Sequence, residues 1–256
     1  MFRCFKALPL ALALAALSIF TASCGPNNPS DNIPAQVRFV NAIQDTAQYG
    51  TALDIAVAGT KEFTDVPFQG FQPSSGYTKI PSGGSALQGI ETGTTIPVFI
   101  ADISLNSSTQ YTLVATGFAT NNDVVLISAL DNNLPPPTGQ ENFRVIDASP
   151  STSLTPVDIY IVPVGSTTPI TPPATISNLA YRSASAYASV SYNPNFVQGV
   201  NYTMFVTATG TTSPILFSQT LSAGSLYSES IRTLVLTDQE NISQLNPSAL
   251  VLNDLN

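Results

Sequence analysis

The stretch VRFVNA at residues 37–42 returns as FRVIDA at residues 143–148, 106 positions later in the chain. Further blocks recur in the same order: LDIAV at 53–57 with VDIYI at 157–161, GTTIP at 93–97 with GTTSP at 210–214, Leu105 and Tyr111 with Leu221 and Tyr227, and Leu130-Asp131 with Thr237-Asp238. Several blocks that keep one order indicate a tandem duplication. The chain therefore contains two copies of one module.

Each copy has the periodicity of β-strands. Residues 202–209 (YTMFVTAT) alternate between two faces, and short apolar runs such as 123–130 and 231–236 are bounded by turn residues. We expect at most one short helix in each copy. The sequence predicts an all-β protein with two tandem immunoglobulin-like or fibronectin-III-like β-sandwich domains.

Domain boundaries follow from these blocks and from composition. We predict repeat 1 over residues 35–133, a Pro-rich linker over 134–141, repeat 2 over 142–240 and a C-terminal tail over 241–256. The consecutive prolines of the linker favour a stiff, extended spacer. The tail contains some apolar residues, and it either packs as a last strand or frays.

The N-terminus has the pattern of an export signal. Arg3 and Lys6 precede an apolar run over residues 7–20, which is too short to span a bilayer. The run ends in Thr21-Ala22-Ser23-Cys24, small residues directly before a cysteine. This ending resembles the lipobox of bacterial lipoproteins.

The lipobox resemblance implies a lipoprotein signal peptide over residues 1–23, lipidation of Cys24, and a flexible tether over residues 24–34 that leads to the sandwiches. Gly25 stands where retention in the inner membrane usually places Asp, so the resemblance also indicates the outer membrane. The alternative is ordinary cleavage near Ala22 or Ser23, which leaves a free secreted protein.

Composition excludes several classes of function. The chain has no histidine, 9% charged residues and a net charge of −8. Without histidine, Ser-His-Asp and Cys-His hydrolases and His-ligated metal sites are excluded. An acidic chain also lacks the basic surface that nucleic acid requires.

The Leu-x5-Tyr spacing of Leu105/Tyr111 and Leu221/Tyr227 resembles the tyrosine corner of fibronectin-III and immunoglobulin-like sandwiches. The resemblance implies that the tyrosine hydroxyl bonds to upstream backbone where the chain crosses between sheets. We therefore interpret these residues as structural. The alternative is an exposed tyrosine that stacks on a ligand.

Taken together, the blocks VRFVNA, LDIAV and GTTIP, and the second copies RVIDASP and VDIYIV, resemble the domain-of-unknown-function family 4397. The resemblance covers most of residues 35–240. It implies β-sandwich repeats in a bacterial envelope or secreted protein, often a lipoprotein. It implies no reaction, because the family has no established activity.

Charged residues stand at matching places in the two copies. Arg38 and Asp54 in the first, and Arg144 and Asp158 in the second, lie on strands whose neighbouring residues are apolar. Strand alternation points each charge away from those neighbours. We predict the cross-strand ion pairs Arg38–Asp54 and Arg144–Asp158 on the first two strands of each copy, with ligand contact as the alternative.

Asp123 and Asp131 lie beside asparagines in loops, and they are the candidate calcium ligands because carboxylate and amide oxygens bind this ion. Neither fits a spaced calcium-loop motif, and Asp and Asn also simply form turns. The sequence therefore commits to no metal, no catalytic residue and no cofactor other than the covalent lipid on Cys24.

These observations predict a monomeric, non-enzymatic, lipid-anchored protein of the bacterial cell envelope that acts as a binding or structural module. Its expected partners are the membrane, through the lipid, and a polysaccharide or another envelope protein. Tyr181, Tyr187 and Tyr192 suit stacking on sugars and suit ordinary strand packing equally. A carboxylate-dependent polysaccharide-active enzyme or accessory domain, and a calcium-stabilised adhesion module, remain the alternatives.

Overall fold

Strands make up most of the chain that the structure describes, as the period-two alternation predicts. The computed structural model describes residues 33–46, 52–164, 170–191, 201–222, 230–239 and 247–254. The predicted signal peptide, Cys24 and Tyr227 lie outside these residues. In the described part of the chain, no helix is long and apolar enough to cross a membrane.

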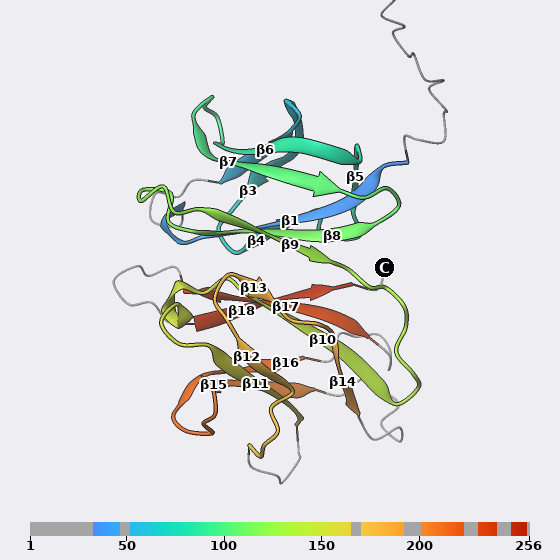
Figure 1. Ribbon diagram of the computed structural model, residues 1–256, viewed down its shortest axis with the longest axis vertical. Coiled ribbons are helices and arrows are strands. Elements are labelled where there is room, and N and C mark those ends of the chain that lie inside the picture. Colours follow the sequence, from blue (N-terminus) through green and yellow to red (C-terminus); the bar gives the residue numbers. More distant parts are fainter. Residues whose placement is uncertain are drawn as a thin grey trace, which may run out of the picture. The chain divides into compact units, whose positions relative to one another are not determined.

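The first repeat folds as two sheets. Its strands are β1 (Ala35–Ile43), β2 (Leu53–Val57), β3 (Thr60–Val66), β4 (Gly70–Gln72), β5 (Thr78–Ile80), β6 (Gly83–Glu91), β7 (Pro97–Leu105), β8 (Gln110–Gly117) and β9 (Val125–Leu130). One sheet has the order β4-β1-β8-β9, with β5 also paired to β1, and the other has the order β3-β2-β6-β7 (Figure 1).

The second repeat has the same topology. Its strands are β10 (Gln140–Asp147), β11 (Val157–Pro163), β12 (Ile176–Leu179), β13 (Ser183–Ala184), β14 (Ala188–Ser191), β15 (Tyr202–Ala208), β16 (Ile215–Leu221), β17 (Ile231–Asp238) and β18 (Pro247–Asn253). Its sheets have the orders β13-β10-β17-β18, with β14 also paired to β10, and β12-β11-β15-β16. Strands β1 to β9 therefore correspond one to one with β10 to β18, which confirms the all-β sandwich class.

Three details differ from what the sequence predicts. The long pairs β1–β8 and β10–β17 are parallel, whereas immunoglobulin-like sheets are antiparallel. In addition, the segment predicted as a tail over residues 241–256 contains β18, which pairs with β17 along its whole length. The second repeat thus extends beyond residue 240, because its last strand is needed to match β9. The connection between the repeats also lies earlier in the chain than the predicted linker, since β9 ends at Leu130 and β10 begins at Gln140.

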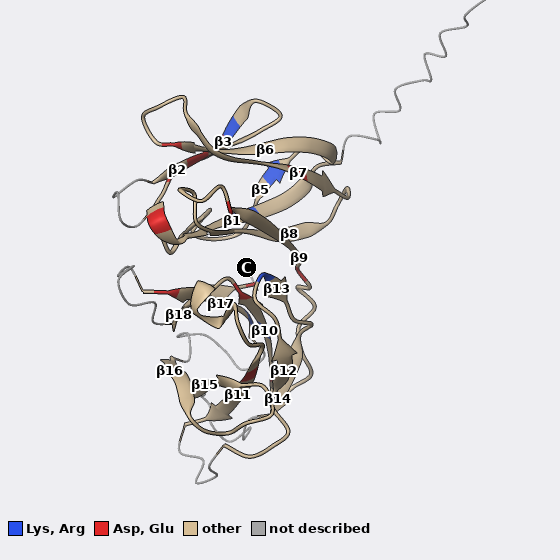
Figure 2. Ribbon diagram, turned by 60° about the vertical axis from the view of Figure 1, so that its left-hand side comes forward, with Lys and Arg blue, Asp and Glu red and all other residues tan. Residues whose placement is uncertain are grey.

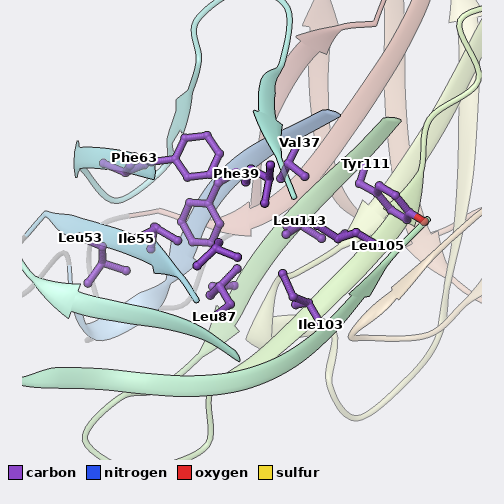
Figure 3. Packing of buried hydrophobic residues seen from close by; sticks show 14 of the residues in the cluster. Val37, Phe39, Leu53, Ile55, Phe63, Leu87, Ile103, Leu105, Tyr111 and Leu113 are labelled. Carbon is purple, nitrogen blue, oxygen red and sulfur yellow. The ribbon is translucent and has the colours of Figure 1, made fainter. Parts of the chain in front are cut away.

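Each repeat has its own apolar core between its two sheets. In the first, Phe39 on β1 packs against Phe63 on β3, with ring centroids 6.0 Å apart, and Leu87 and Leu113 lie in the same cluster (Figure 3). In the second, Phe143 meets Tyr202 edge-on at 5.1 Å. These inward positions are those that the alternation of the sequence predicts.

A third apolar cluster joins the two repeats. Val40, Ala42, Val114, Ile127 and Ala129 come from the first repeat, and Ile146, Ala148, Val235 and Leu252 come from the second. These residues alternate with the inward ones, so they belong to the outer faces of the sheets that contain β1 and β10. Both faces of these two strands are therefore buried, including the polar residues Arg38 and Arg144.

Candidate functional site

Arg38 and Arg144 occupy equivalent places on β1 and β10, and both are about 2% exposed. Each guanidinium binds an aspartate of the other repeat. The Nη2 of Arg38 donates to Oδ1 of Asp254 at 2.5 Å, and the Nη2 of Arg144 donates to Oδ1 of Asp131 at 2.5 Å. Both aspartate side chains are fully buried. Two reciprocal ion pairs therefore lie inside the contact between the repeats. Charged residues are sparse along the ribbon (Figure 2).

The aspartates are equivalent by position as well as by role. Asp131 follows β9 and its N–H donates to the carbonyl of Gln110, while Asp254 follows β18 and donates in the same way to Ile231. The alignment of Asp131 with Asp238 was therefore wrong. Its true counterpart, Asp254, lies in the segment predicted as a tail.

The second carboxylate oxygen of each aspartate binds hydroxyl groups of its own repeat. Oδ2 of Asp131 accepts from Thr112 at 2.7 Å and from Tyr77 at 2.8 Å. The same contacts join Asp254 to Thr233 at 2.6 Å and to Tyr187 at 2.8 Å. Each arginine also lies over the ring of the tyrosine in its own repeat, 5.4 Å away for Arg38 and 4.8 Å for Arg144.

The surroundings of this cluster raise the pKa of both its tyrosines and of Arg144. Burial, together with the carboxylate of Asp131, raises the pKa of Tyr77, and burial likewise raises the pKa of Tyr187. Both hydroxyls therefore remain donors. Burial alone would lower the pKa of Arg144, but the charges of Asp131, Tyr187 and Asp254 together with the hydrogen bond to Asp131 outweigh burial, and the pKa is raised. The charged groups of this cluster bind one another and the hydroxyls beside them, which suits a structural role.

The predicted pairs Arg38–Asp54 and Arg144–Asp158 are wrong. Arg38 and Asp54 lie on strands of different sheets, because the chain crosses from one sheet to the other between β1 and β2. The alternation of the sequence correctly predicted that the two arginines point away from the core of each sandwich. The second repeat, rather than solvent or β2, covers the face to which they turn.

Asp54 and Asp158 instead hold a bulge in the neighbouring edge strand. Oδ1 of Asp54 accepts the N–H of Asp65 at 2.9 Å, and Oδ1 of Asp158 accepts the N–H of Asn178 at 2.8 Å. Both donors have left-handed backbone, with φ of 55° and 54°. Lys61 also pairs with Asp54 at 2.6 Å and lowers the pKa of that carboxyl.

The corner residues differ between the repeats. The hydroxyl of Tyr111 accepts the backbone N–H of Asn106 at 3.0 Å, where the chain passes from β7 to β8. Leu105 and Leu221 are both buried in their cores. By strand register, Tyr111 pairs with Val37 and Arg232 pairs with Phe143, so Arg232 is the counterpart of Tyr111.

At the second corner, the guanidinium of Arg232 contacts the backbone in place of a tyrosine hydroxyl. Its Nη1 donates to the carbonyl of Ser222 at 2.9 Å, and its Nη2 lies 3.3 Å from the buried carboxylate of Glu141. Burial raises the pKa of Glu141, and the charge of Arg232 opposes this. The assignment of the second corner to Tyr227 therefore does not match the register of the strands.

The calcium interpretation of Asp131 is also wrong, because protein donors already bind both carboxylate oxygens. Oδ2 of Asp123 lies 2.6 Å from Nη2 of Arg182, which belongs to the second repeat. The part of the chain that the structure describes contains no group of three or more side chains that could hold a metal ion.

A second buried acidic pair was not predicted. Asp147 and Asp238 are both 0% exposed, and Ser149 bridges them: its N–H donates to Asp147 at 3.1 Å and its hydroxyl to Asp238 at 2.6 Å. Burial raises the pKa of Asp147 to about 6, and the charge of Asp238 adds to this. The pair shapes the connection through η3 (Pro150–Thr152), the equivalent of η2 (Gln44–Thr46) in the first repeat.

The second repeat has an open groove of about 380 Å³ between the edges of its two sheets. The groove is lined by residues 175–179, which include β12. It is also lined by residues 183–188, which include β13, the turn after it and the first residue of β14. Figure 1 labels these three strands. Every lining side chain is uncharged. Tyr187 lines the groove while its hydroxyl is bound to Asp254, and Tyr192 lies outside the described residues.

The fold defines a protein built from two β-sandwich repeats, and a family model matches part of it. Residues 35–160 match the family DUF4397, a domain of unknown function. The chain therefore carries a DUF4397-like domain over this range, which includes the whole first repeat, β10 and the first part of β11.

Other comparisons add little. No curated protein matches this chain. Among solved structures, it is similar to the crystal structure of a family 26 carbohydrate-binding module from Eubacterium rectale Amy13K in complex with maltoheptaose. The identity is 9% and the TM-score 0.23, over 85% of this chain and 95% of that one. A likeness at this level carries no conclusion about what this chain binds.

Proposed function

We propose that the chain is a non-enzymatic, lipid-anchored protein of the bacterial cell envelope, and that its second repeat binds an uncharged ligand. The observation that carries the proposal is the groove between β12 and β13–β14. Its volume of about 380 Å³ lies within the range of ligand sites. Its lining combines apolar residues such as Ile176 and Leu179 with the hydroxyl groups of serines and the amide of Asn178.

Rigidity supports this role. The reciprocal ion pairs and the shared apolar cluster fix the second repeat against the first. Further contacts do the same, such as the hydrogen bond from the hydroxyl of Thr116 to the carbonyl of Ala148 at 2.7 Å. A groove on a fixed body loses little conformational entropy when a ligand enters it.

The buried acids support a binding role rather than a catalytic one. Asp131 and Asp254 neutralise arginines, Asp147 and Asp238 accept hydrogen bonds within a chain connection, and none of these four lines the groove. General acid–base catalysis needs such a group within reach of a substrate. In this protein the described buried carboxylates face other protein groups instead.

The anchor is tested separately from the groove. The lipobox-like ending at Cys24 and the tether before β1 support attachment through lipid, most simply as a monomer at the outer membrane. We expect wild-type protein in the membrane fraction of the producing bacterium, labelled by palmitate, and Cys24→Ser in the soluble fraction without label. A wild-type protein that remains soluble and unlabelled would contradict the anchor.

The groove is tested by crosslinking in intact cells. A photoactivatable residue at Ala186, which is exposed in the groove, should capture a partner. The matched control is the same residue at Ala86, which is exposed on β6 of the first repeat. Adducts at position 186 and not at 86 support the binding role, whereas no adduct, or equal adducts, would overturn it.

A further inference from the structure

The two repeats carry the same edge strand with the same bulge. In β3 the register shifts between the pairs Ile55–Phe63 and Leu53–Val66, and in β12 it shifts between Ile159–Ile176 and Val157–Leu179. The two bulged residues are therefore Thr64 and Asp65 in the first repeat and Ser177 and Asn178 in the second. Thr64 and Ser177 are equivalent, and both are exposed.

In the first repeat, a side chain occupies the open edge of β3. The carboxamide of Gln72 on β4 accepts the N–H of Thr64 at 3.2 Å and donates to the carbonyl of Thr64 at 2.5 Å. Both main-chain groups of one residue are thus satisfied by one amide. This is the pattern that a neighbouring strand would provide.

In the second repeat, the equivalent side chain is too short to do this. Gln72 pairs with Phe39 on β1, and the matching position beside Val145 on β10 is Ser185. The hydroxyl of Ser185 accepts the N–H of Val145 at 3.0 Å, so it bonds to its own sheet. The space that Gln72 fills in the first repeat is the groove in the second, and both Ser177 and Ser185 line it.

The geometry of the edge selects the chemistry of the ligand. The N–H and C=O of a single residue in a strand point to the same side, so their complement is one residue of another extended chain or a primary carboxamide such as that of Gln72. The N–H and C=O of a trans secondary amide, as in an N-acetyl sugar, point to opposite sides and cannot bind both groups.

We infer that the groove binds an extended peptide segment, which adds to β12 as a further strand and pairs with the main chain of Ser177. This rests on the proposed binding role and names its ligand. Peptide recognition by strand addition uses an open sheet edge for affinity and adjoining pockets for side-chain preference. Here β12 offers four residues, Ile176–Leu179. The lining by Ala184, Ala186 and Ala188 favours small or β-branched uncharged side chains.

The inference is tested with variants that close the edge of β12 in the second repeat and open the edge of β3 in the first. Peptides are selected from a phage-displayed random heptapeptide library on residues 25–256 and then titrated as synthetic peptides by calorimetry. Ser185→Gln restores the bridging carboxamide and should weaken binding at least tenfold. Ser185→Ala removes the same hydrogen bond to Val145 but leaves the groove open, so binding should stay within about twofold. Gln72→Ser should add a second site and raise the stoichiometry from one to two.

Amide hydrogen exchange gives a reading that does not depend on selection of a peptide. In the wild-type protein, the N–H of Thr64 should exchange more slowly than that of Ser177, because only Thr64 has a bound carboxamide. Ser185→Gln should slow exchange at Ser177, and a bound peptide should do the same. Equal exchange at both amides, or no enriched peptide, or peptide affinity that Ser185→Gln leaves unchanged, would overturn the inference.

The two proposals fail differently. If position 186 captures a polysaccharide in cells and no peptide binds, the binding role stands and the peptide inference is overturned. If position 186 captures nothing and no peptide binds, both are overturned.

Discussion

The guanidinium of Arg38 donates a 2.5 Å hydrogen bond to the carboxylate of Asp254, 216 residues further along the chain. Arg144 and Asp131 make the same bond in the opposite sense. Each repeat thus contributes one arginine to the contact, and one of its aspartates binds the arginine of the other repeat. This is the reciprocal arrangement of a two-fold interface, formed here within a single chain. A shift of either repeat would leave two buried charges without partners, so the network fixes the register of the contact.

Removal of one buried arginine should destabilise the protein strongly. Arg38→Met keeps much of the apolar volume but leaves Asp254 buried and charged without its partner, which costs about 3–5 kcal/mol. Lys61→Ala is the control, because the Lys61 side chain is 52% exposed in its pair with Asp54 and its loss should cost less than about 1 kcal/mol. Urea unfolding measures both, and similar losses in the two variants would show that the buried pair is not a main stabiliser.

The repeats should unfold together, since they share a buried network and an apolar cluster. We expect a single calorimetric transition for residues 25–256. In Arg38→Met/Arg144→Met, both aspartates lose their partners, and the transition should split into two or become broader than a two-state process allows. Two separate transitions in the wild-type protein would contradict this coupling.

Strand periodicity was enough to predict the all-β class and the inward residues of each core, and the recurring blocks were enough to predict the duplication. It also predicted that Arg38 points away from Phe39. It could not show what covers that outward face, because alternation looks the same beside solvent and beside a second repeat. The partner of Arg38 is therefore the part of the site that sequence reasoning missed.

The missed aspartate has a physical cause too. Asp131 was aligned with Asp238 because both stand at the end of a hydrophobic strand. The register of β17 and β18 assigns that place to Asp254 instead. A count of strands would have found it: a first repeat that ends with an antiparallel pair β8–β9 requires a strand after β17. The bridge by Gln72 had no sequence signal, since its effect depends on the distance between two sheet edges.

Acid should stabilise the connection around Asp147. The pKa of Asp147 is raised to about 6 from 3.8 by burial, so the folded state binds more protons than the unfolded state between these values. Its contribution is fully present below about pH 4 and is lost as the pH rises through about 6. Asp147→Asn should therefore be more stable than wild type at pH 8, by up to roughly 3 kcal/mol, and the difference should vanish near pH 4.

Asparagine is a fair replacement there, because Asn41 holds the equivalent turn in the first repeat, where its Oδ1 accepts the N–H of Ile43 at 3.1 Å. Urea unfolding of both proteins from pH 4 to pH 8 measures the difference. A variant that is less stable than wild type at pH 8, or a difference that does not change with pH, would count against the raised pKa.

The two corner residues should differ in their importance for stability. Tyr111→Phe loses one neutral hydrogen bond to the N–H of Asn106, which costs about 0.5–1.5 kcal/mol. Arg232→Met removes the charge partner of Glu141, whose side chain is fully buried, and should cost about 3–5 kcal/mol at pH 7. Because burial raises the pKa of Glu141, protonation should relieve part of this loss in acid.

Unfolding at pH 7 and pH 5, with Arg232→Met/Glu141→Leu as the control that removes both charges, separates the lost charge pair from lost packing. Equal losses in Tyr111→Phe and Arg232→Met, or a double variant no more stable than Arg232→Met, would show that packing alone holds the second corner.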